Sequence, residues 1–596
     1  MRPAQALLVA SLLLEACLGF ADDIELTPEV SVTGGLIRGV RLTNGVDQFT
    51  GIPFAKPPTP ENDGRWRAPE EPESWEGTLS LTDWAPICSQ GKQGDEDCLY
   101  LNVWTASSNQ YRTDANATED LLPVMMFIHG GGFETGSVQS YNGSDIMETL
   151  DNSIVYVTTP YRLGPFGFLG SEVLRNRTVG EFGGTTGNYG MLDQRMALKW
   201  LQENIATFGG DPSRVTIWGQ SAGASSVSNH MSMPGSKGLY HRAIIESSSF
   251  SPSVSKTLES AEDLFARYTE LLDCPSDGQE AVDCLLSKSA GELNEAAGEL
   301  PACCDFFNIF LPWAPVVDGT ELPLHPFEAI ETEGALQVDD DFPILQGNNR
   351  DEGSLPLQVQ PHNLDLDGLE DDWAFNYGAA QLDALNALYL PTSSPAVFYS
   401  PFYFADSNAL GDFWVGCPTE RVARKQRALG NRPLYQYNFQ ALDPFSFHGT
   451  ETFFVFQFVL QNQKASDAAK SLAVLTAKYW ANFGANGDPN ADGVPNWPRY
   501  DSSALGSTQI IDLEGNLSHP TDGVKREECD FWIPYEEDIL AECKERFPCG
   551  ARAKNTTFTI ETEITRSEKE LQTHQTVAQV VQNFTHAAHT WGGFFA

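Results

Sequence analysis

The stretch that decides the fold is Arg214-Val-Thr-Ile-Trp-Gly-Gln-Ser-Ala-Gly223. Its first half is rich in β-branched and aromatic residues, which predicts a short buried strand, and the small residues at 222–227 predict a helix. Gly219, Ser221 and Gly223 fit the G-x-S-x-G pattern of a strained strand-to-helix turn that lifts a serine hydroxyl out of a sheet. The serine would lie at a helix N-terminus, where free N–H groups favour negative charge. The pattern therefore predicts that Ser221 is a nucleophile.

Apolar strands and amphipathic helices alternate around this stretch. Residues 124–128 and 154–158 are continuous apolar runs, as expected of strands buried on both faces. Residues 191–208 have helical spacing, and residues 255–335 are helical and acidic, as in a cap packed over a sheet edge. This alternation predicts an α/β fold with a central, mostly parallel sheet, helices on both faces and helical cap insertions. Later elements are expected at residues 342–345 and 434–438 (strands) and 465–483 (helix).

The composition is that of an acidic globular protein. The 596 residues include 81 Asp and Glu against 37 Lys and Arg, which gives a formal net charge of −44, and 41% of them are hydrophobic. Phosphate backbones are attracted by positive surfaces, so this charge argues against nucleic acid as a partner. The excess of acid fits either a solubility requirement or the steering of cationic substrates, and the sequence leaves both open.

The N-terminal segment predicts export. Arg2, an apolar run at residues 6–14 and small residues at 19–21 make residues 1–21 fit a secretory signal peptide. No later segment has the roughly 20 apolar residues that span a bilayer. We therefore expect a secreted, extracellular protein, and sequons for N-glycosylation fit that route. The sequons are at Asn116, Asn142, Asn176, Asn516, Asn555 and Asn583.

The cysteines also fit an oxidising compartment. Removal of Cys17 with the signal peptide leaves ten of the 11 cysteines, an even number, and no spacing suggests a zinc site. Two short loops and one long-range bridge are expected, namely Cys88–Cys98, Cys274–Cys284 and Cys417–Cys529. The pairing stays open for Cys303, Cys304, Cys543 and Cys549.

A glycine run supplies the second feature that a nucleophilic serine needs, an oxyanion hole. His129-Gly-Gly-Gly-Phe133 follows the apolar run at residues 124–128. Only glycine lets a backbone lie so close to a substrate carbonyl, and loss of one oxyanion donor costs roughly 100- to 1000-fold in rate. We assign the donors to the N–H groups of Gly131, Gly132 and Ala222. A flexible glycine hairpin is the alternative interpretation.

A histidine late in the chain would serve as the base. His448 lies in a loop after the last expected parallel strand and before an apolar helix, which fits the chain order nucleophile, acid, base. Other histidines lie beside proline or in polar loops, which predicts surface positions. These are His325, His362 and His519.

A carboxylate must hold the imidazole in the right tautomer and stabilise its cation. Gly347-Asn-Asn-Arg-Asp-Glu-Gly-Ser354 follows the strand expected at residues 342–345. Either Asp351 or Glu352 could serve. Most carboxylates of so acidic a chain only solvate the surface, so the spacing leaves this choice open.

Five sequence blocks share a family pattern. They are Gln220-Ser-Ala-Gly223, His129-Gly-Gly-Gly-Phe133, Glu96-Asp-Cys-Leu-Tyr-Leu-Asn102, Asp351-Glu-Gly-Ser354 and His448-Gly-Thr-Glu451. Together they resemble the type-B carboxylesterase/cholinesterase family over roughly residues 27–545. The resemblance implies an α/β-hydrolase fold with Ser221 as nucleophile, Glu352 as acid and His448 as base. It also implies the disulfides Cys88–Cys98 and Cys274–Cys284 and supports Cys417–Cys529.

The chain also departs from the cholinesterase pattern. Cholinesterases place a tryptophan for the choline cation ten residues before the cysteine of the Glu-Asp-Cys block, and this chain has Cys88 there. Gln220 stands where cholinesterases have a glutamate, which removes a charge that favours a cation. Residues 242–249, Arg-Ala-Ile-Ile-Glu-Ser-Ser-Ser, differ from the usual Gln-Ser-Gly block near the acyl site. These departures argue against choline esters.

We therefore predict a secreted serine hydrolase of small to medium carboxylic esters that acts through an acyl-enzyme and needs no metal or organic cofactor. Its domain is expected at residues 22–549, before a polar tail at 550–596 that is loosely ordered or an oligomer arm. Phe-rich stretches at 402–404 and 453–456 leave open a lipase or sterol esterase with an apolar acyl tunnel. A non-catalytic adhesion protein on the same fold is the other alternative, although such members typically lose a triad residue.

Overall fold

A computed structural model describes residues 25–108, 121–177, 184–300, 312–354, 364–390, 400–430, 432–442, 446–513, 515 and 517–546. For residue 375 and residues 537–546 it describes the backbone alone. Several predicted features lie outside the described residues. They are the signal segment 1–21, His362, Cys303, Cys304, Cys549, the side chain of Cys543, the sequons at Asn116, Asn516, Asn555 and Asn583, and the tail 550–596.

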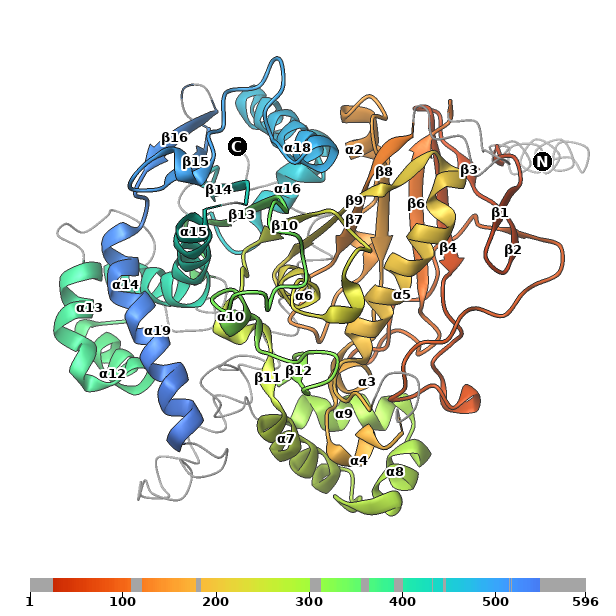
Figure 1. Cartoon of the computed structure of the whole chain (residues 1–596), viewed down its shortest axis with the longest axis horizontal. Helices are drawn as coiled ribbons and strands as arrows, with labels where there is room; N and C mark the ends of the chain where they lie inside the picture. Colours follow the sequence, from red (N-terminus) through yellow and green to blue (C-terminus); the bar gives the residue numbers. More distant parts are fainter. Residues whose placement is uncertain are drawn as a thin grey trace, which may run out of the picture.

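A large sheet organises the described part of the chain (Figure 1). Its eleven strands there have the order β16-β15-β14-β13-β10-β9-β7-β8-β6-β4-β3. Every pair from β8 through β7, β9, β10, β13 and β14 to β15 is parallel. The pairs at both edges are antiparallel, so the predicted mostly parallel sheet is confirmed. The bounds are β3 (Val40–Arg41), β4 (Val46–Pro53), β6 (Tyr100–Ala106), β7 (Leu122–Ile128), β8 (Val155–Thr159), β9 (Gly210–Gln220), β10 (Arg242–Glu246), β13 (Ile344–Asn349), β14 (Leu434–Phe439), β15 (Ser507–Ile511) and β16 (Ser518–Asp522).

Helices cover both faces of the sheet, which explains why its central strands are apolar throughout. Successive side chains of a strand point to opposite faces. In β7, Met126 and Ile128 pack with α5 and α6, whereas Met125 and Phe127 pack on the other face with α2, α16 and α18. Both sets are buried, so none of these four positions faces water. The bounds are α2 (Ser144–Thr149), α5 (Tyr189–Asn204), α6 (Ala222–His230), α16 (Thr450–Val455) and α18 (Asp467–Asn486).

Two helical groups lie beyond the sheet (Figure 1). The first contains α7, α8 and α9, as the acidic stretch 255–335 predicts, but that stretch also contains a short parallel pair, β11 with β12. The second group contains α12, α13, α14 and α19, which pack on a separate aromatic core around Trp373 and Trp532. The bounds are β11 (Lys256–Thr257), β12 (Val316–Val317), α7 (Leu258–Leu271), α8 (Gly278–Ser287), α9 (Ala290–Glu299), α12 (Leu366–Tyr377), α13 (Leu382–Tyr389), α14 (Pro401–Gly411), α15 (Cys417–Leu429) and α19 (Arg526–Arg546).

The structure contains the three disulfides that the sequence predicts. Cys88–Cys98 closes a short loop before β6, and Cys274–Cys284 joins the chain after α7 to α8. Cys417–Cys529 joins α15 to α19 across 112 residues of sequence. The long-range bridge therefore ties the last described helix to the helical segment beside β13.

Predictions about the surface are confirmed in part. Asn142 and Asn176 are exposed, as glycosylation acceptors must be, and His519 is exposed on β16. The surface position predicted for His325 is wrong, because its side chain is buried and caps the N-terminus of α10 (Pro326–Ala329). The proline beside it marks the start of a helix rather than an exposed loop. None of the helices in the described ranges has the length and apolar character needed to cross a membrane.

Candidate active site

Ser221 lies at the sharp turn between β9 and α6. Its φ of 58° and ψ of −124° are rare for a residue with a side chain. A Cβ on Gly219 would lie 2.3 Å from the carbonyl carbon of Gly223, and a Cβ on Gly223 would lie 2.0 Å from the Ile128 oxygen. The two glycines therefore allow the strand and the helix to approach so closely. Strain of this kind costs about 1–3 kcal/mol and occurs mainly at functional sites.

The neighbouring strand and the helix prepare Ser221 for chemistry. Its N–H donates to the Glu246 carbonyl of β10 at 2.9 Å, which fixes the turn. Ser221 is the N-cap residue of α6, yet its side chain makes no capping hydrogen bond. The hydroxyl is thus available to a substrate at the positive end of a helix.

The glycine loop after β7 lies directly against this turn. A Cβ on Gly130 would lie 3.0 Å from the Cβ of Ser221. Gly131 and Gly132 have φ angles of 112° and 64°, in the region that glycine adopts most readily. Within the described residues neither amide donates to a backbone carbonyl. The loop therefore presents free N–H groups beside Ser221, as the predicted oxyanion hole requires.

The other end of that loop is fixed by a buried histidine. The His129 ring stacks on Tyr161 with ring centroids 4.5 Å apart, and the Tyr161 hydroxyl donates to the His129 carbonyl at 2.9 Å. Burial lowers the pKa of His129 to about 4, so the ring is neutral at physiological pH. This histidine supports the glycine loop by packing.

His448 and Glu352 meet beside the same turn. Nδ1 of His448 lies 2.6 Å from Oε2 of Glu352, and both side chains are buried. His448 follows β14 and Glu352 follows β13, and these strands are parallel neighbours whose carboxyl ends lie together. With Nδ1–H donating to Glu352, Nε2 accepts from the Gln220 amide at 3.3 Å. The imidazole thus lies next to the residue that precedes Ser221.

The structure also gives the neighbouring Asp351 a different position. Its Oδ2 accepts the N–H of Ser446 at 2.8 Å, and its own N–H donates to the Ser446 carbonyl at 3.0 Å. Arg350 forms an ion pair with it at 2.9 Å. Asp351 therefore clamps the two loops together, and Glu352 is the carboxylate that reaches the imidazole. These contacts favour Glu352 in the choice that spacing left open.

The surroundings of His448 favour its charged form. Burial of the imidazole lowers its pKa, but the charge and hydrogen bond of Glu352, together with the charge of Glu451, outweigh burial and raise the pKa above 6.5. A base that binds its proton more tightly accepts it more readily from a serine hydroxyl.

Three side chains that sequence reasoning did not single out complete the site. Ser247 donates to Oε1 of Glu352 at 2.6 Å and lies 3.2 Å from Oε1 of Glu451. The backbone N–H of Asn349 donates to Glu352 at 2.6 Å, and the side-chain amide of Asn349 donates a hydrogen bond to Glu451. Burial, then the nearby charge of Glu352, raises the pKa of Glu451 to about 7. Ser247 and Asn349 each follow or end a parallel strand, which is the signal that could have identified them.

A further buried carboxylate lies behind this group. Glu246 accepts from the indole N–H groups of Trp218 and Trp480, each at 2.7 Å. Burial, then the charge of Glu451, raises the pKa of Glu246. Among the described side chains no group of three or more His, Cys, Asp or Glu residues could hold a metal ion. The site is therefore a serine, a histidine and buried acids held by neutral donors.

Known proteins are similar to this chain in sequence and in fold. The family model described as "Carboxylesterase family" matches residues 26–532. The mouse (Mus musculus) protein named Carboxylesterase 1C is 31% identical over 554 residues, which cover 85% of this chain and 93% of the relative. The mouse protein named Acylcarnitine hydrolase is 32% identical over 530 residues, which cover 81% of this chain and 86% of the relative.

A solved structure extends the agreement to the fold. The structure titled PNB esterase superposes with a TM-score of 0.68 at 30% sequence identity, and the match covers 84% of this chain and 99% of that chain. The α/β-hydrolase fold that the family resemblance implies is therefore confirmed. The chain belongs to the carboxylesterase family, and it is an enzyme that hydrolyses carboxylic esters.

Proposed function

We propose that Ser221, His448 and Glu352 are the catalytic triad of a secreted esterase that acts through an acyl-enzyme. The observation that carries the proposal is the 2.6 Å contact of His448 with Glu352, at a histidine that lies beside the strained Ser221 turn. Glu352 holds the Nδ1–H tautomer, so Nε2, which accepts from the Gln220 amide at 3.3 Å, is the basic nitrogen. Gly131, Gly132 and Ala222 supply the oxyanion donors.

Acylation follows from these positions. Ser221 Oγ bonds to the ester carbonyl carbon while its proton passes to His448 Nε2, and the carbonyl electron pair moves to the oxygen. The oxyanion is stabilised by the N–H groups of Gly131, Gly132 and Ala222. Collapse of this intermediate breaks the bond to the alcohol, which leaves with the proton from His448. The acyl group remains on Ser221.

Deacylation repeats the same steps with water. His448 takes a proton from a water molecule as its oxygen bonds to the acyl carbon, and the second tetrahedral intermediate again places its oxyanion in the same hole. When the bond to Ser221 Oγ breaks, the proton on His448 returns to the serine. The carboxylic acid leaves, and the enzyme is restored with no external reductant, oxidant or metal needed.

Small to medium esters are the proposed substrates. The names of the relatives point to different esters, so they do not fix one. Phe454 and Phe456, which could have lined a long acyl tunnel, are fully buried, and the Phe456 ring stacks on Trp218 at 4.8 Å. Tyr403 is buried and donates to the Ser354 carbonyl at 3.0 Å. These three packed rings favour the esterase over the lipase interpretation, whereas Phe402, Phe404 and Phe453 of the same stretches are half-buried.

Hydrolysis of p-nitrophenyl esters from acetate to palmitate tests the proposal. We expect the highest kcat/KM on short chains, and we expect Ser221→Ala to lose at least about 10⁴-fold in kcat. Ser225→Ala is a matched control, because it removes a buried hydroxyl one turn further along α6 and should keep activity within ten-fold. A rate that peaks at palmitate and rises at a lipid interface would indicate a lipase. Full activity in Ser221→Ala would contradict the triad.

Secretion is supported by the three disulfides, which persist in oxidising compartments. Asn142 and Asn176 are exposed and accessible to glycosylation. Expression in a eukaryotic host tests both points. We expect the enzyme in the medium, starting after residue 21, with a mass that falls on treatment with an N-glycan endoglycosidase. Retention in the cell with residues 1–21 still attached would contradict secretion.

A further inference from the structure

An aromatic ring lies against the proposed base. Trp414 lies against His448 with ring centroids 4.9 Å apart and ring planes 31° apart. It is the third residue of η8 (Asp412–Gly416), a π-helical turn between α14 and α15. Such turns insert an extra residue into a helix and occur frequently at functional sites. The turn thus places an indole where a regular helix would place another side chain.

Hydrogen bonds fix the orientation of this indole. Nε1 of Trp414 donates to Oγ of Ser253 at 3.2 Å, and the Trp414 carbonyl accepts from Oγ of Ser251 at 3.0 Å. Both serines belong to the segment that follows β10. The face of the ring, rather than its N–H edge, is therefore left to contact His448.

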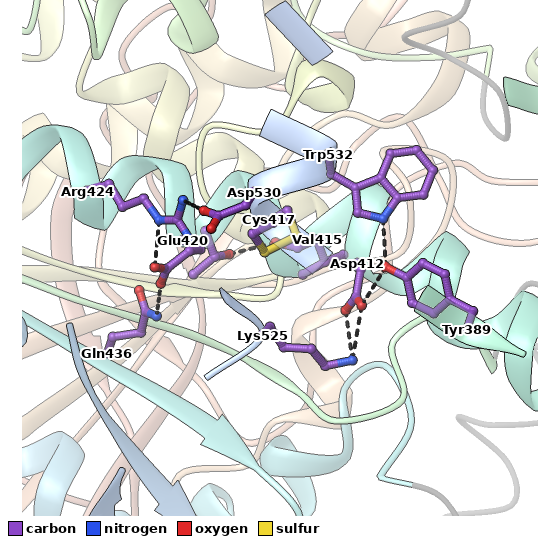
Figure 2. Close-up of a disulfide and its surroundings, with 12 residues drawn as sticks. Tyr389, Asp412, Val415, Cys417, Glu420, Arg424, Gln436, Lys525, Asp530 and Trp532 are labelled. Carbon is purple, nitrogen blue, oxygen red and sulfur yellow. Dashed lines mark hydrogen bonds and ion pairs between the residues drawn. A yellow bond between two sulfur atoms is a disulfide. The ribbon is translucent and has the colours of Figure 1, made fainter. Parts of the chain in front are cut away.

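The turn itself is held from both ends (Figure 2). Its first residue, Asp412, forms an ion pair with Lys525 at 2.9 Å and accepts from the Tyr389 hydroxyl at 2.9 Å. The residue after its end is Cys417, which forms the disulfide with Cys529. Trp414 lies between these two anchors, so the indole has little freedom to leave the imidazole.

The same helix end also packs on the loop of the catalytic acid. A Cβ on Gly411, the last residue of α14, would lie 3.3 Å from the Cβ of Glu352, and a Cβ on Gly353 would lie 2.1 Å from the Ser407 carbonyl oxygen. No side chain larger than hydrogen fits at this contact. The element that carries Trp414 is thus built against the loop that carries Glu352, and both act on one imidazole.

We propose that Trp414 is a positioning residue for His448, whose indole face holds the imidazole between Glu352 and Ser221 and stabilises the imidazolium formed in each half-reaction. The π-face of tryptophan attracts a cation more strongly than that of tyrosine or phenylalanine. The inference rests on the proposed role of His448 as base. It adds that the Trp414 ring, which lies against the imidazole, contributes to that role.

The charged groups around the imidazole affect the pKa of His448, which a pH profile of activity would report. Glu352 and Glu451 are the carboxylates that act on His448. On the side of η8, Asp412 is balanced by Lys525, so that pair contributes little net charge. Removal of the indole therefore removes a cation-stabilising face without a change in formal charge nearby.

The test compares Trp414→Leu with Trp414→Phe in the full-length enzyme on p-nitrophenyl acetate. We expect Trp414→Leu to lower kcat about three- to thirty-fold and to move the acid limb of kcat/KM to lower pH by about 0.5 to 1, because the imidazolium loses a favourable partner. Trp414→Phe keeps an aromatic face. It should therefore retain most of the activity, and the acid limb of its kcat/KM should lie close to that of wild type. Melting temperature is measured for both, to separate folding from positioning.

Trp75→Leu is the matched control. Trp75 is also partly buried and also donates its indole N–H, to the Leu36 carbonyl at 2.9 Å, but it lies on the N-terminal strands. We expect it to leave the pH profile unchanged. Equal profiles for Trp414→Leu and wild type, or equal losses in the Leu and Phe variants, would overturn the inference. Full activity of His448→Ala would instead overturn the proposed triad, so the two failures are distinguishable.

Discussion

Buried carboxylates are held in two different ways in this molecule. Beside the Cys417–Cys529 disulfide, each acid has a cationic partner (Figure 2). Asp412 is paired with Lys525 at 2.9 Å, and Glu420 is paired with Arg424 at 2.9 Å. This region joins the helices around α19 to the body of the enzyme, and these two acids are paired with cations where they lie.

Beneath the Ser221 turn the acids have no such partner. Within the described residues Glu246, Glu352 and Glu451 form no ion pair with lysine or arginine, and hydroxyl, amide and indole groups bind them. A fixed cation there would compete with the imidazolium for the negative potential. Neutral donors orient the acids and leave that potential to His448. The difference separates a region built for stability from one built to respond to a proton.

The largest effect is expected when the acid that touches His448 loses its charge. Glu352→Gln should lower kcat about 10³- to 10⁴-fold, because a glutamine neither stabilises the imidazolium nor enforces the Nδ1–H tautomer. The melting temperature should change little, since the amide fills the same volume. Steady-state kinetics on p-nitrophenyl acetate measures the first effect and thermal unfolding the second.

Asp351→Asn is the neighbouring control for that variant. Asp351 pairs with Arg350 and accepts from the Ser446 N–H, and an asparagine oxygen can still accept that hydrogen bond. We expect kcat within ten-fold of wild type. A loss as large as that of Glu352→Gln would show that the two adjacent acids do not divide their roles as the contacts indicate.

The next effect concerns the other region. Lys525→Met should cost about 3 kcal/mol of stability, because Asp412, with 4% of its side chain exposed, would be left as a buried charge without its cation. Unfolding by heat or urea measures this cost. Activity should stay within about ten-fold, since Cys417–Cys529 still holds η8.

A double variant sharpens the result. In an Asp412→Asn background no buried charge remains, so the same lysine substitution should cost about 1 kcal/mol or less. If both backgrounds lose equally, the cost comes from lost packing of the lysine stem and not from the unpaired acid. The contrast between the two regions would then lose its electrostatic basis.

The parts of the site that could be predicted from sequence are local. The Ser221 turn and the glycine loop at 130–132 depend on glycines within a few residues, since only glycine fits the close approaches found there. His448 could be placed by its order in the chain. The choice of Glu352 over Asp351 required either the family resemblance or the contacts themselves, because spacing treats adjacent acids alike.

The rest of the site depends on contacts between distant strands. Ser247 and Glu451 are 204 residues apart in the sequence and meet because β10, β13 and β14 are successive neighbours in the sheet. Trp414 reaches His448 from a π-helical turn, which no hydrophobic period predicts. Neutral partners such as Asn349 carry no charge, so no charge pattern in the sequence predicts that they bind the buried acids. These features follow from the order of the strands in the sheet. Sequence patterns predict the class of sheet, mostly parallel with helices on both faces, but not that order.

A smaller effect is expected from Glu451, the buried acid whose pKa Glu352 raises. Burial and the charge of Glu352 raise the pKa of Glu451 from 4.5 to about 7, so the folded state binds this proton more tightly than the unfolded chain. Ionisation of buried Glu451 therefore lowers the free energy of unfolding. This effect is absent below pH 4.5 and complete above pH 7. Glu451→Gln lacks it and should gain about 1–3 kcal/mol relative to wild type between pH 5 and pH 8.

Thermal unfolding at the two pH values measures that gain. The glutamine oxygen can accept from Asn349, and its amide can donate to the Ser247 hydroxyl, so the variant keeps the hydrogen bonds of the site. Loss of one nearby negative charge should also move the acid limb of kcat/KM to lower pH. A variant that is less stable at pH 8 than wild type would mean that Glu451 is not under strain from its neighbours.

The smallest expected effect comes from a charge added on the opposite side of the imidazole. The Gln220 amide lies 3.3 Å from His448 Nε2, so Gln220→Glu would give the imidazolium a second anionic partner. The pKa of His448 is raised by Glu352, and the added carboxylate should move the acid limb of kcat/KM up by about one further unit. Esters with a quaternary ammonium group should gain up to about ten-fold over neutral esters of the same shape. If the limb stays in place while cationic esters gain, the added carboxylate faces the substrate and not His448, and the neutral donors of the wild-type site would then matter for specificity more than for the proton.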